Sequence, residues 1–172
     1  MSDLLTIQNL SVAFQQKNSM VCAVEDLTFC LKRNQTIAVI GESGSGKSIT
    51  ALAVLGLLPS NAIISGKIIL RPKQGQETNL SSIDEKELNN IRGKKIGMIF
   101  QEPLTALNPL LTCGKQLTNV IRQHLQLTKV EAKKKALNLF EKVELPHPKE
   151  LFNKYPHQLS GGQRQRVMIA MA

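Results

Sequence analysis

The clearest chemistry in the sequence lies in one glycine-rich segment, which we call the phosphate loop. Its residues are Gly41, Glu42, Ser43, Gly44, Ser45, Gly46, Lys47 and Ser48, with Ile49 directly after them. The spacing is G-x-x-x-x-G-K-[ST], in which glycines let the backbone curve so that several amides point at one anion. Lys47 would bring a full positive charge to the outer phosphates, and the Ser48 hydroxyl would bind Mg²⁺. The segment therefore predicts a site for a nucleoside triphosphate, with ATP and Mg²⁺ as the ligands.

The elements expected around the phosphate loop suit that chemistry. Residues 36–40 are apolar and mostly β-branched, which predicts a strand covered on both faces. Residues 47–58 predict a helix that is apolar on almost every side and is therefore buried. Phosphate binding needs a loop between a strand and a helix, because the positive end of the helix dipole then faces the anion. The alternative, a glycine–serine linker that matches the spacing by chance, does not account for this context.

A second segment, Leu159-Ser160-Gly161-Gly162-Gln163, also precedes a predicted helix. Ser160 and Gln163 fit a capping box, which is a purely structural interpretation. That interpretation does not explain Gly161 and Gly162, because glycine in the first helical turn lowers the stability of the helix. Bare backbone at a helix N-terminus predicts instead an anion site that a ligand or partner can approach closely.

The first half of the chain is predicted to be mainly β-structure. Leu5 to Phe14 alternates between apolar and polar residues with one slip, which indicates a bulge, and Val21 to Leu31 is the expected partner strand. Asn34 is expected to take a left-handed conformation in the turn that follows. The other expected elements are strands over 65–70 and 95–100, a polar loop over 71–82, and a short helix over 82–91 with a capping box at Ser82.

The second half is predicted to be helical. Helices are expected over 114–125, over 129–143 and after Ser160. Thr128 and Glu131 would cap the middle helix, whose expected apolar stripe is Val130, Leu137, Phe140 and Val143. Strands followed by helices predict an α/β fold with N-terminal antiparallel strands and a helical subdomain. The expected parts are a β-subdomain and loop core over 1–101, a helical subdomain over 102–160, and a final helix over 160–172.

Composition narrows the remaining function classes. The chain has 172 residues, 42% of them hydrophobic and 20% charged, as in an ordinary globular domain or part of one. No signal peptide is recognisable and residues 49–58 are too short to span a bilayer, so a soluble, cytoplasmic protein is expected. The net charge is +9, but the basic runs lack interleaved aromatic residues, so no direct nucleic-acid binding is expected. Cys22, Cys30 and Cys113 lack metal-site spacing and are interpreted as small apolar residues in a reducing compartment.

Together, the phosphate loop and residues 159–163 resemble the ATP-binding subunit of an ABC transporter, and the resemblance runs the whole length of the chain. It identifies residues 159–163 as the signature segment of that family. It implies that Gln101 is the catalytic glutamine that also meets Mg²⁺, and that Phe14 stacks on adenine. Two such domains pair head to tail in the family. The resemblance therefore implies that Ser160, Gly161, Gly162 and Gln163 contact the ATP held by the other domain.

The resemblance also implies partners and a location. Permease-type transmembrane subunits would contact residues 102–109, and a solute-binding protein would act through them, which places the chain peripherally on the cytoplasmic face of the inner (plasma) membrane. The phosphate loop, residues 100–103 with 107–109, and residues 155–160 are similar to those of importers of peptides, oligopeptides and nickel, with the glutathione class closest in appearance. Nothing in the chain would touch the transported solute.

The family pattern continues beyond the signature helix with the Walker B aspartate, a catalytic glutamate and a switch histidine. None of these stands in the 172 residues, so we expect a fragment whose own hydrolysis is negligible. Two alternatives stay open. One is a non-catalytic module that binds ATP and docks on a partner, and the other is a soluble ABC-type ATPase that acts in repair or translation. The Leu107-Asn108-Pro109 run and the short helical insertion argue against the second.

Overall fold

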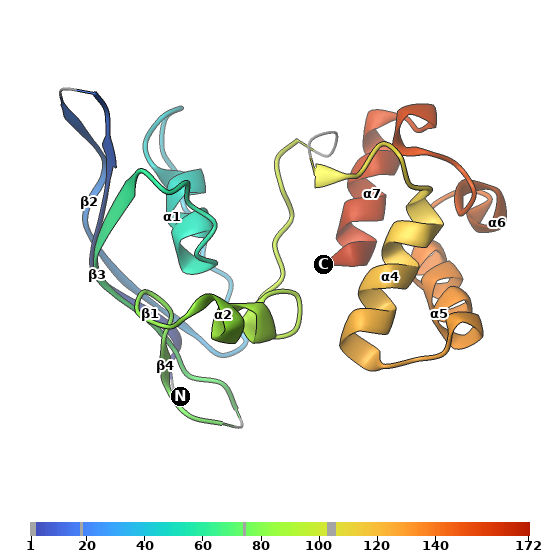
Figure 1. The fold of residues 1–172 in the computed structure, drawn as a ribbon, viewed down its shortest axis with the longest axis horizontal. Coiled ribbons are helices and arrows are strands. Elements are labelled where there is room, and N and C mark those ends of the chain that lie inside the picture. The colour runs from blue at the N-terminus through green and yellow to red at the C-terminus, as the bar shows by residue number, and fades with distance from the viewer. Residues whose placement is uncertain (1–2, 18, 74, 103–105) are drawn as a thin grey trace. The chain divides into compact units, whose positions relative to one another are not determined.

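The computed structural model describes residues 3–17, 19–73, 75–102 and 106–172, which form two compact units, residues 1–96 and 97–172 (Figure 1). Residues 103–105, part of the predicted permease surface, lie outside the described residues. None of the helices within these ranges is long and apolar enough to cross a membrane.

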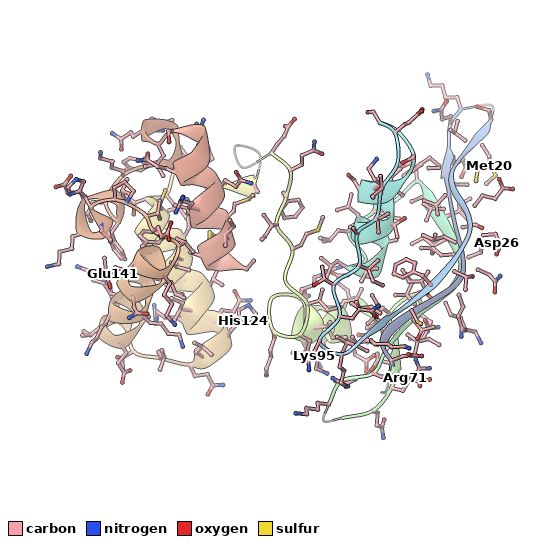
Figure 2. The ribbon with its side chains drawn as sticks, turned by 180° about the vertical axis from the view of Figure 1, so that it is seen from behind. Met20, Asp26, Arg71, Lys95, His124 and Glu141 are labelled. Atoms are coloured by element: carbon pink, nitrogen blue, oxygen red, sulfur yellow. The ribbon has the colours of Figure 1, made fainter. Side chains whose placement is uncertain are left out.

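The first unit is built on a four-stranded antiparallel sheet in the order β2-β1-β3-β4. Its strands are β1 (Asp3–Gln15), β2 (Met20–Lys32), β3 (Ala62–Leu70) and β4 (Thr78–Asn79). The predicted pairing of β1 with β2 is confirmed, and β3 begins three residues before the expected start. Residues 71–82, predicted as loop, include the short strand β4. Met20 and Asp26 lie on the outer side of the sheet, away from the helices (Figure 2).

The slip predicted in the first strand is confirmed as a bulge at Asn9. Asn9 has a positive φ of 48°, and the register of β1 with both neighbours shifts there. The side-chain amide of Asn9 donates to Asp26 Oδ1 at 2.7 Å, which stabilises the bulge from β2. Asn34 has a φ of 58°, so its predicted left-handed conformation is also confirmed. These local irregularities were readable because Asn tolerates that conformation better than most residues.

Two helices, α1 (Lys47–Val54) and α2 (Glu85–Ile91), cover one side of this sheet (Figure 1). The core between them consists of apolar residues from the sheet and both helices, namely Ile7, Leu10, Val12, Val24, Ala53, Val54, Ile68, Leu70, Leu80 and Ile91. The prediction that α1 is buried on almost every side is wrong, because Ala51 is exposed and Leu57, just beyond the helix, is 39% exposed. The helix also ends before residue 58. The cap of α2 is Asp84, which accepts from the Glu87 amide, and not Ser82.

Two expected strands, 36–40 and 95–100, are not formed. Residues 35–42 and 97–100 have no regular structure, and a single bridge between Arg92 and Ile96 is all the pairing that the described chain shows there. Burial on both faces is wrong for the first of them, because Val39 is 55% exposed and Ile40 92% exposed. Apolar, β-branched composition favours an extended backbone, but a strand also requires a neighbour to which its amides and carbonyls can bond.

The second unit contains the helices α4 (Cys113–Leu125), α5 (Lys129–Lys142), α6 (Pro148–Leu151), η1 (Pro156–Gln158) and α7 (Gly161–Met171). The three long helices agree closely with prediction, and α7 packs against both α4 and α5. Their shared core includes Cys113, Leu117, Phe140 and Val167, all nearly or fully inaccessible to solvent.

The capping predicted for α5 is confirmed, but its predicted apolar stripe is partly wrong. Thr128 and Glu131 make the reciprocal bonds of a capping box. The side chains that α5 buries are Ala132, Ala136 and Phe140, whereas Val130 is 80% exposed. Two alanines at a spacing of four let α5 lie close to its neighbours, and a stripe based on large side chains alone misses them.

Candidate functional site

The backbone of the phosphate loop takes a shape that requires glycine at two positions. Gly44 and Gly46 have φ of 85° and 84°, where side chains other than glycine are strained. A Cβ on Gly46 would lie 2.5 Å from the carbonyl oxygen of Ala23 and 2.8 Å from Val24 Cγ2, whereas one on Gly44 would meet nothing within 4 Å. The loop therefore rests on β2 at Gly46, while residues 41–45 are exposed.

The ammonium group of Lys47 lies over this loop. It donates to the carbonyl oxygens of Gly41 at 2.8 Å and Glu42 at 2.6 Å, and to Ser45 Oγ at 3.1 Å. A second bond inside the loop joins the Ser45 amide to the Glu42 oxygen at 3.2 Å. These bonds place the Lys47 ammonium at the phosphate loop, the segment for which the sequence predicts phosphate binding. A bound phosphate would compete with carbonyl oxygens for the same ammonium.

The helix that follows the loop starts without a side-chain cap. Helices α2, α4, α5 and α7 start at Asp84, Thr112, Thr128 and Ser160, each of which accepts a first-turn amide. Helix α1 starts at Gly46 and has no such bond, so its first amides keep their donor capacity for another acceptor. Inside α1, Thr50 donates both its amide and its hydroxyl to the Gly46 oxygen, at 2.8 and 3.0 Å, and fixes the first turn. Free amides, a helix dipole and an ammonium fit a phosphate group.

The signature segment has the predicted capping box, but its glycines face outwards. Ser160 Oγ accepts from the Gln163 amide at 3.3 Å, and Gln163 Oε1 accepts from the Ser160 amide at 3.0 Å. Gly161 and Gly162 are exposed, and a Cβ on either would meet no atom within 4 Å. No acceptor among the described residues takes their amides. The packing of this chain therefore gives no reason for glycine here.

At the N-terminus of α4, unlike that of α7, the first amides already have acceptors within the chain. The Cys113 and Gly114 amides donate to the carbonyl oxygens of Lys154 and Phe152, at 2.9 and 3.0 Å, so the chain itself occupies them. Cys113 is fully buried, and burial raises the pKa of its thiol to about 11. Cys113 is thus a core residue, whereas Cys22 and Cys30 are exposed, and all three are free thiols.

The other predicted site residues have less distinctive surroundings. Phe14 is half-buried against the sheet core, opposite Val21 of β2 and Ala62 of β3. Ser48 is exposed, and Ile49 packs against the same core. Gln101 is exposed in a bend that belongs to the second unit. Just before the signature segment, the Tyr155 ring stacks on His157 with 5.7 Å between centroids.

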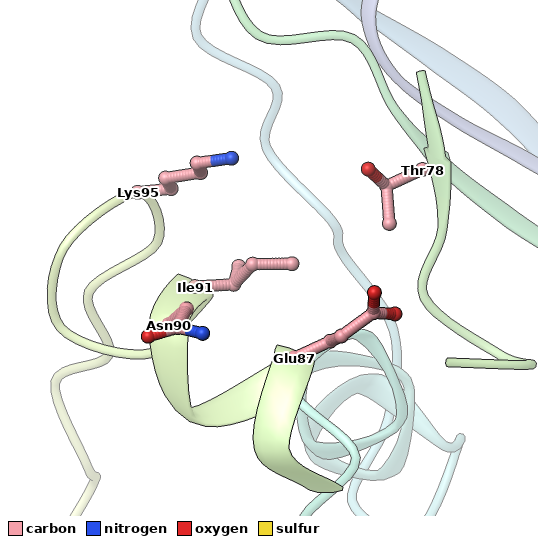
Figure 3. A pocket seen from close by; sticks show the side chains of 5 residues that line it. All are labelled: Thr78, Glu87, Asn90, Ile91 and Lys95. Carbon is pink, nitrogen blue, oxygen red and sulfur yellow. The ribbon is translucent and has the colours of Figure 1, made fainter. Parts of the chain in front are cut away.

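Two open pockets accompany these features. One, of about 610 Å³, is lined by Gly162, Gln165, Arg166 and Ile169 of α7 and by residues 142–144. The other, of about 210 Å³, lies between β4 and α2 and is lined by Thr78, Glu87, Asn90, Ile91 and Lys95 (Figure 3). No predicted ATP contact lines the second pocket. Among the residues that the structure covers, no three His, Cys, Asp or Glu side chains gather as a metal site would require.

A model of the family described as ABC transporter matches residues 24–172, which is most of the chain. The chain belongs to the ABC transporter family. Among solved structures, this ABC chain is similar to the dimeric ATP-binding cassette MJ0796 bound to ADP and Pi, with a TM-score of 0.82, 27% identity, and coverage of 98% of this chain and 68% of the other. Its fold is thus that of an ABC cassette.

Further relatives agree with this family. The glutathione import ATP-binding proteins GsiA of Escherichia coli O1:K1 / APEC and of Shigella dysenteriae serotype 1 are each 42% identical over 172 residues, or 99% of this ABC chain. The chain spans only 28% of the length of these two relatives. A structure of cbiO1 from Clostridium perfringens shares the fold with a TM-score of 0.67 and 24% identity, covering 99% of this chain and 61% of that one.

Proposed function

We propose that this chain is the nucleotide-binding part of an ABC importer subunit of the peptide, dipeptide or glutathione class, which binds Mg-ATP at the phosphate loop. The observation that carries the proposal is the uncapped start of α1 beneath the Lys47 ammonium. Every other helix of at least seven residues in the described chain has its first turn capped by a side chain. An anion is the natural acceptor for the amides that remain.

Each residue of this site has a separate role in the proposal. Amides of residues 41–48 surround the phosphates, Lys47 neutralises the outer ones, and Ser48 gives its hydroxyl to Mg²⁺. Gln101 would be a second ligand of that ion and would orient the attacking water. Phe14 would present the exposed part of its ring to adenine, with its other side packed on the sheet core.

The signature segment serves a second nucleotide-binding domain in this proposal. Gly161 and Gly162 offer exposed amides at a helix N-terminus, and their lack of side chains lets a phosphate of the partner's ATP come close. The relative MJ0796, whose structure is dimeric and holds ADP and Pi, supports a paired arrangement. ATP binding would then bring two domains together, with each ATP between one phosphate loop and the other signature segment.

Transport partners follow from the relatives. GsiA is a glutathione import ATP-binding protein, so permease-type membrane subunits and, through them, a solute-binding protein are the proposed partners. The proposed contact surface is residues 102–109, and one side chain holds its described end, around Asn108, in place. The Gln116 side chain accepts from the Asn108 amide and donates to the oxygens of Asn108 and Leu111, all within 3.0 Å. Leu110, held on this loop, is 82% exposed. These contacts would place the chain on the cytoplasmic face of the membrane.

Calorimetric titration with Mg-ATP tests the central proposal. Lys47→Ala removes charge-assisted hydrogen bonds worth about 1.5–3 kcal/mol each, so the affinity should fall by about 100-fold or more. Lys67→Ala is a matched control, because Lys67 is an exposed lysine of β3 in the same unit. The control should bind as the parent does. Equal affinity of the Lys47 variant and the parent would remove the assignment.

A further inference from the structure

The carboxyl end of α1, at the opposite end of the helix from the phosphate loop, has its own anchor. The Leu57 amide bonds to the Leu52 oxygen at 2.9 Å and the Gly56 amide to the Ala53 oxygen at 3.1 Å, with Gly56 at a φ of 59°. This is a Schellman motif, which ends the helix sharply. It leaves the carbonyl oxygens of Leu55 and Gly56 pointing beyond the last turn.

Arg92, which directly follows α2, takes both of those oxygens. Its Nε donates to the Leu55 oxygen and its Nη2 to the Gly56 oxygen, each at 2.8 Å. Its Nη1 donates to Glu85 Oε1 at the start of α2. The Arg92 side chain is only 19% exposed, so these bonds are partly shielded from water. A planar guanidinium can hold two carbonyls and a carboxylate at once, and its charge also suits the negative end of α1.

The backbone at Gly56, where α1 ends, also packs closely against α2. A Cβ on Gly56 would lie 2.8 Å from Leu88 Cδ1 and 3.2 Å from Arg92 Nη2. Helix α2 therefore touches the end of α1 through Leu88 and Arg92, with Glu85 joined to the same guanidinium. We call these four residues, Gly56, Glu85, Leu88 and Arg92, the α1 clamp.

We propose that Arg92 is a positioning residue for the phosphate loop: by holding the carboxyl end of α1 against α2, it fixes the direction of the first-turn amides and of Lys47. An α-helix is stiff, and one of eight residues is only about 12 Å long, so a tilt at one end moves the other. The amino end rests on β2 at Gly46, as the close Ala23 oxygen shows, and the clamp supplies the second fixed point. This inference rests on the proposed ATP binding.

A matched arginine separates positioning from general stability. Arg71 also pairs with a glutamate, Glu77, and donates to Thr6 Oγ1, but it touches neither α1 nor the phosphate loop. Its side chain is 33% exposed. Arg71→Met should lower the melting temperature, as Arg92→Met should, and should leave Mg-ATP affinity unchanged.

The experiment compares the parent chain with Arg92→Met, Arg92→Lys and Arg71→Met by Mg-ATP titration, thermal melting and amide NMR. We expect Arg92→Met to weaken binding by about tenfold, because small misplacements of binding groups are costly. Lysine can reach one carbonyl, so Arg92→Lys should recover part of the loss. The amide signals of Gly46 and Lys47 should shift in Arg92→Met without ATP, and not in Arg71→Met.

The experiment distinguishes failure of the proposed ATP binding from failure of the positioning role of Arg92. If the parent does not bind Mg-ATP, the proposed function fails, and the amide signals still decide whether Arg92 positions the loop. If the parent binds and Arg92→Met binds equally well with unmoved Gly46 and Lys47 signals, the positioning role is overturned. Should Arg92→Met fail to fold, the contrast between Arg92→Lys and Arg71→Met decides. Equal affinity and equal loop signals in those two variants would overturn the inference.

Discussion

The phosphate loop and the signature segment both contain glycines at the start of a helix. The structure requires glycine at Gly46 but does not require it at Gly161 or Gly162. Gly46 cannot be replaced without a collision with the Ala23 carbonyl, and its φ is positive. Gly161 and Gly162 have ordinary helical backbone and open space where a Cβ would stand. The fold of the chain itself demands the first glycine. The packing of the described chain does not demand the second pair, which fits the proposed approach of a ligand from outside.

The two helix starts differ in their caps as well. Helix α7 has a complete capping box, so its stability does not depend on a ligand. Helix α1 has none, and Lys47 donates to loop carbonyls. A ligand at α1 would complete an unfinished helix terminus, whereas one at α7 would add to a finished one. The comparison therefore predicts that ATP stabilises the first unit directly.

The largest effect is expected when a glycine of the phosphate loop is replaced by alanine, because this changes the stability of the first unit. Gly46→Ala combines left-handed strain with the 2.5 Å collision, and should destabilise the first unit by about 2–5 kcal/mol. Gly44→Ala carries the strain without the collision, so about 1–2 kcal/mol is expected. Urea unfolding followed by circular dichroism measures both. Equal costs for the two variants would contradict the account of Gly46 as a packing requirement.

The signature glycines should respond with the opposite sign in stability. Gly161→Ala and Gly162→Ala place a better helix former where there is room, so each should stabilise the chain by about 0.4–1 kcal/mol. The same methyl group would stand where the partner's phosphate is proposed to lie, and ATP-dependent association should weaken. Urea midpoints and sedimentation with Mg-ATP give the two readings. A variant that is more stable and associates normally would leave these glycines without a role in pairing.

The N-terminus of α4, whose first amides are bonded within the chain, is expected to show the smallest effect, a difference in thiol reactivity. Helix starts usually favour a thiolate, but burial prevails at Cys113 and raises the pKa of its thiol to about 11. At pH 8, a disulfide reagent should react rapidly with the exposed Cys22 and Cys30 and with Cys113 only after unfolding. Cys113→Ala should remove the slow reaction alone. Rapid reaction of all three thiols in the folded chain would show that this helix start is open after all.

Local signals in the sequence predicted much of the fold. The bulge at Asn9, the turn at Asn34 and the capping boxes of α5 and α7 each depend on residues within a few positions of one another. The strands expected over 36–40 and 95–100 failed because strand formation depends on a partner, which composition does not reveal. The stripe of α5 failed for a related reason, since Ala132 and Ala136 are buried through tertiary packing.

In the candidate site, too, some contacts between residues close in sequence were predictable and contacts between distant residues were not. Spacing alone predicted the bonds between Ser160 and Gln163. It singled out Lys47 for its charge, but the bonds from Lys47 to the loop carbonyls came from the structure. Spacing could not predict that Gly46 lies on the Ala23 carbonyl or that Arg92 reaches the end of α1, because these residues are far apart in the chain. An arginine directly after a short helix is too common a pattern to indicate such a bond.

The stacked pair Tyr155 and His157 has a practical consequence. The chain has one tyrosine and no tryptophan, so the fluorescence excited in the tyrosine absorption band, beyond that of phenylalanine, originates from a single ring. That ring lies five residues before Ser160 and is 39% exposed, in contact with an imidazole that can quench it. The protein therefore carries an intrinsic fluorophore beside its signature segment. Changes there on nucleotide addition can be followed without any attached dye.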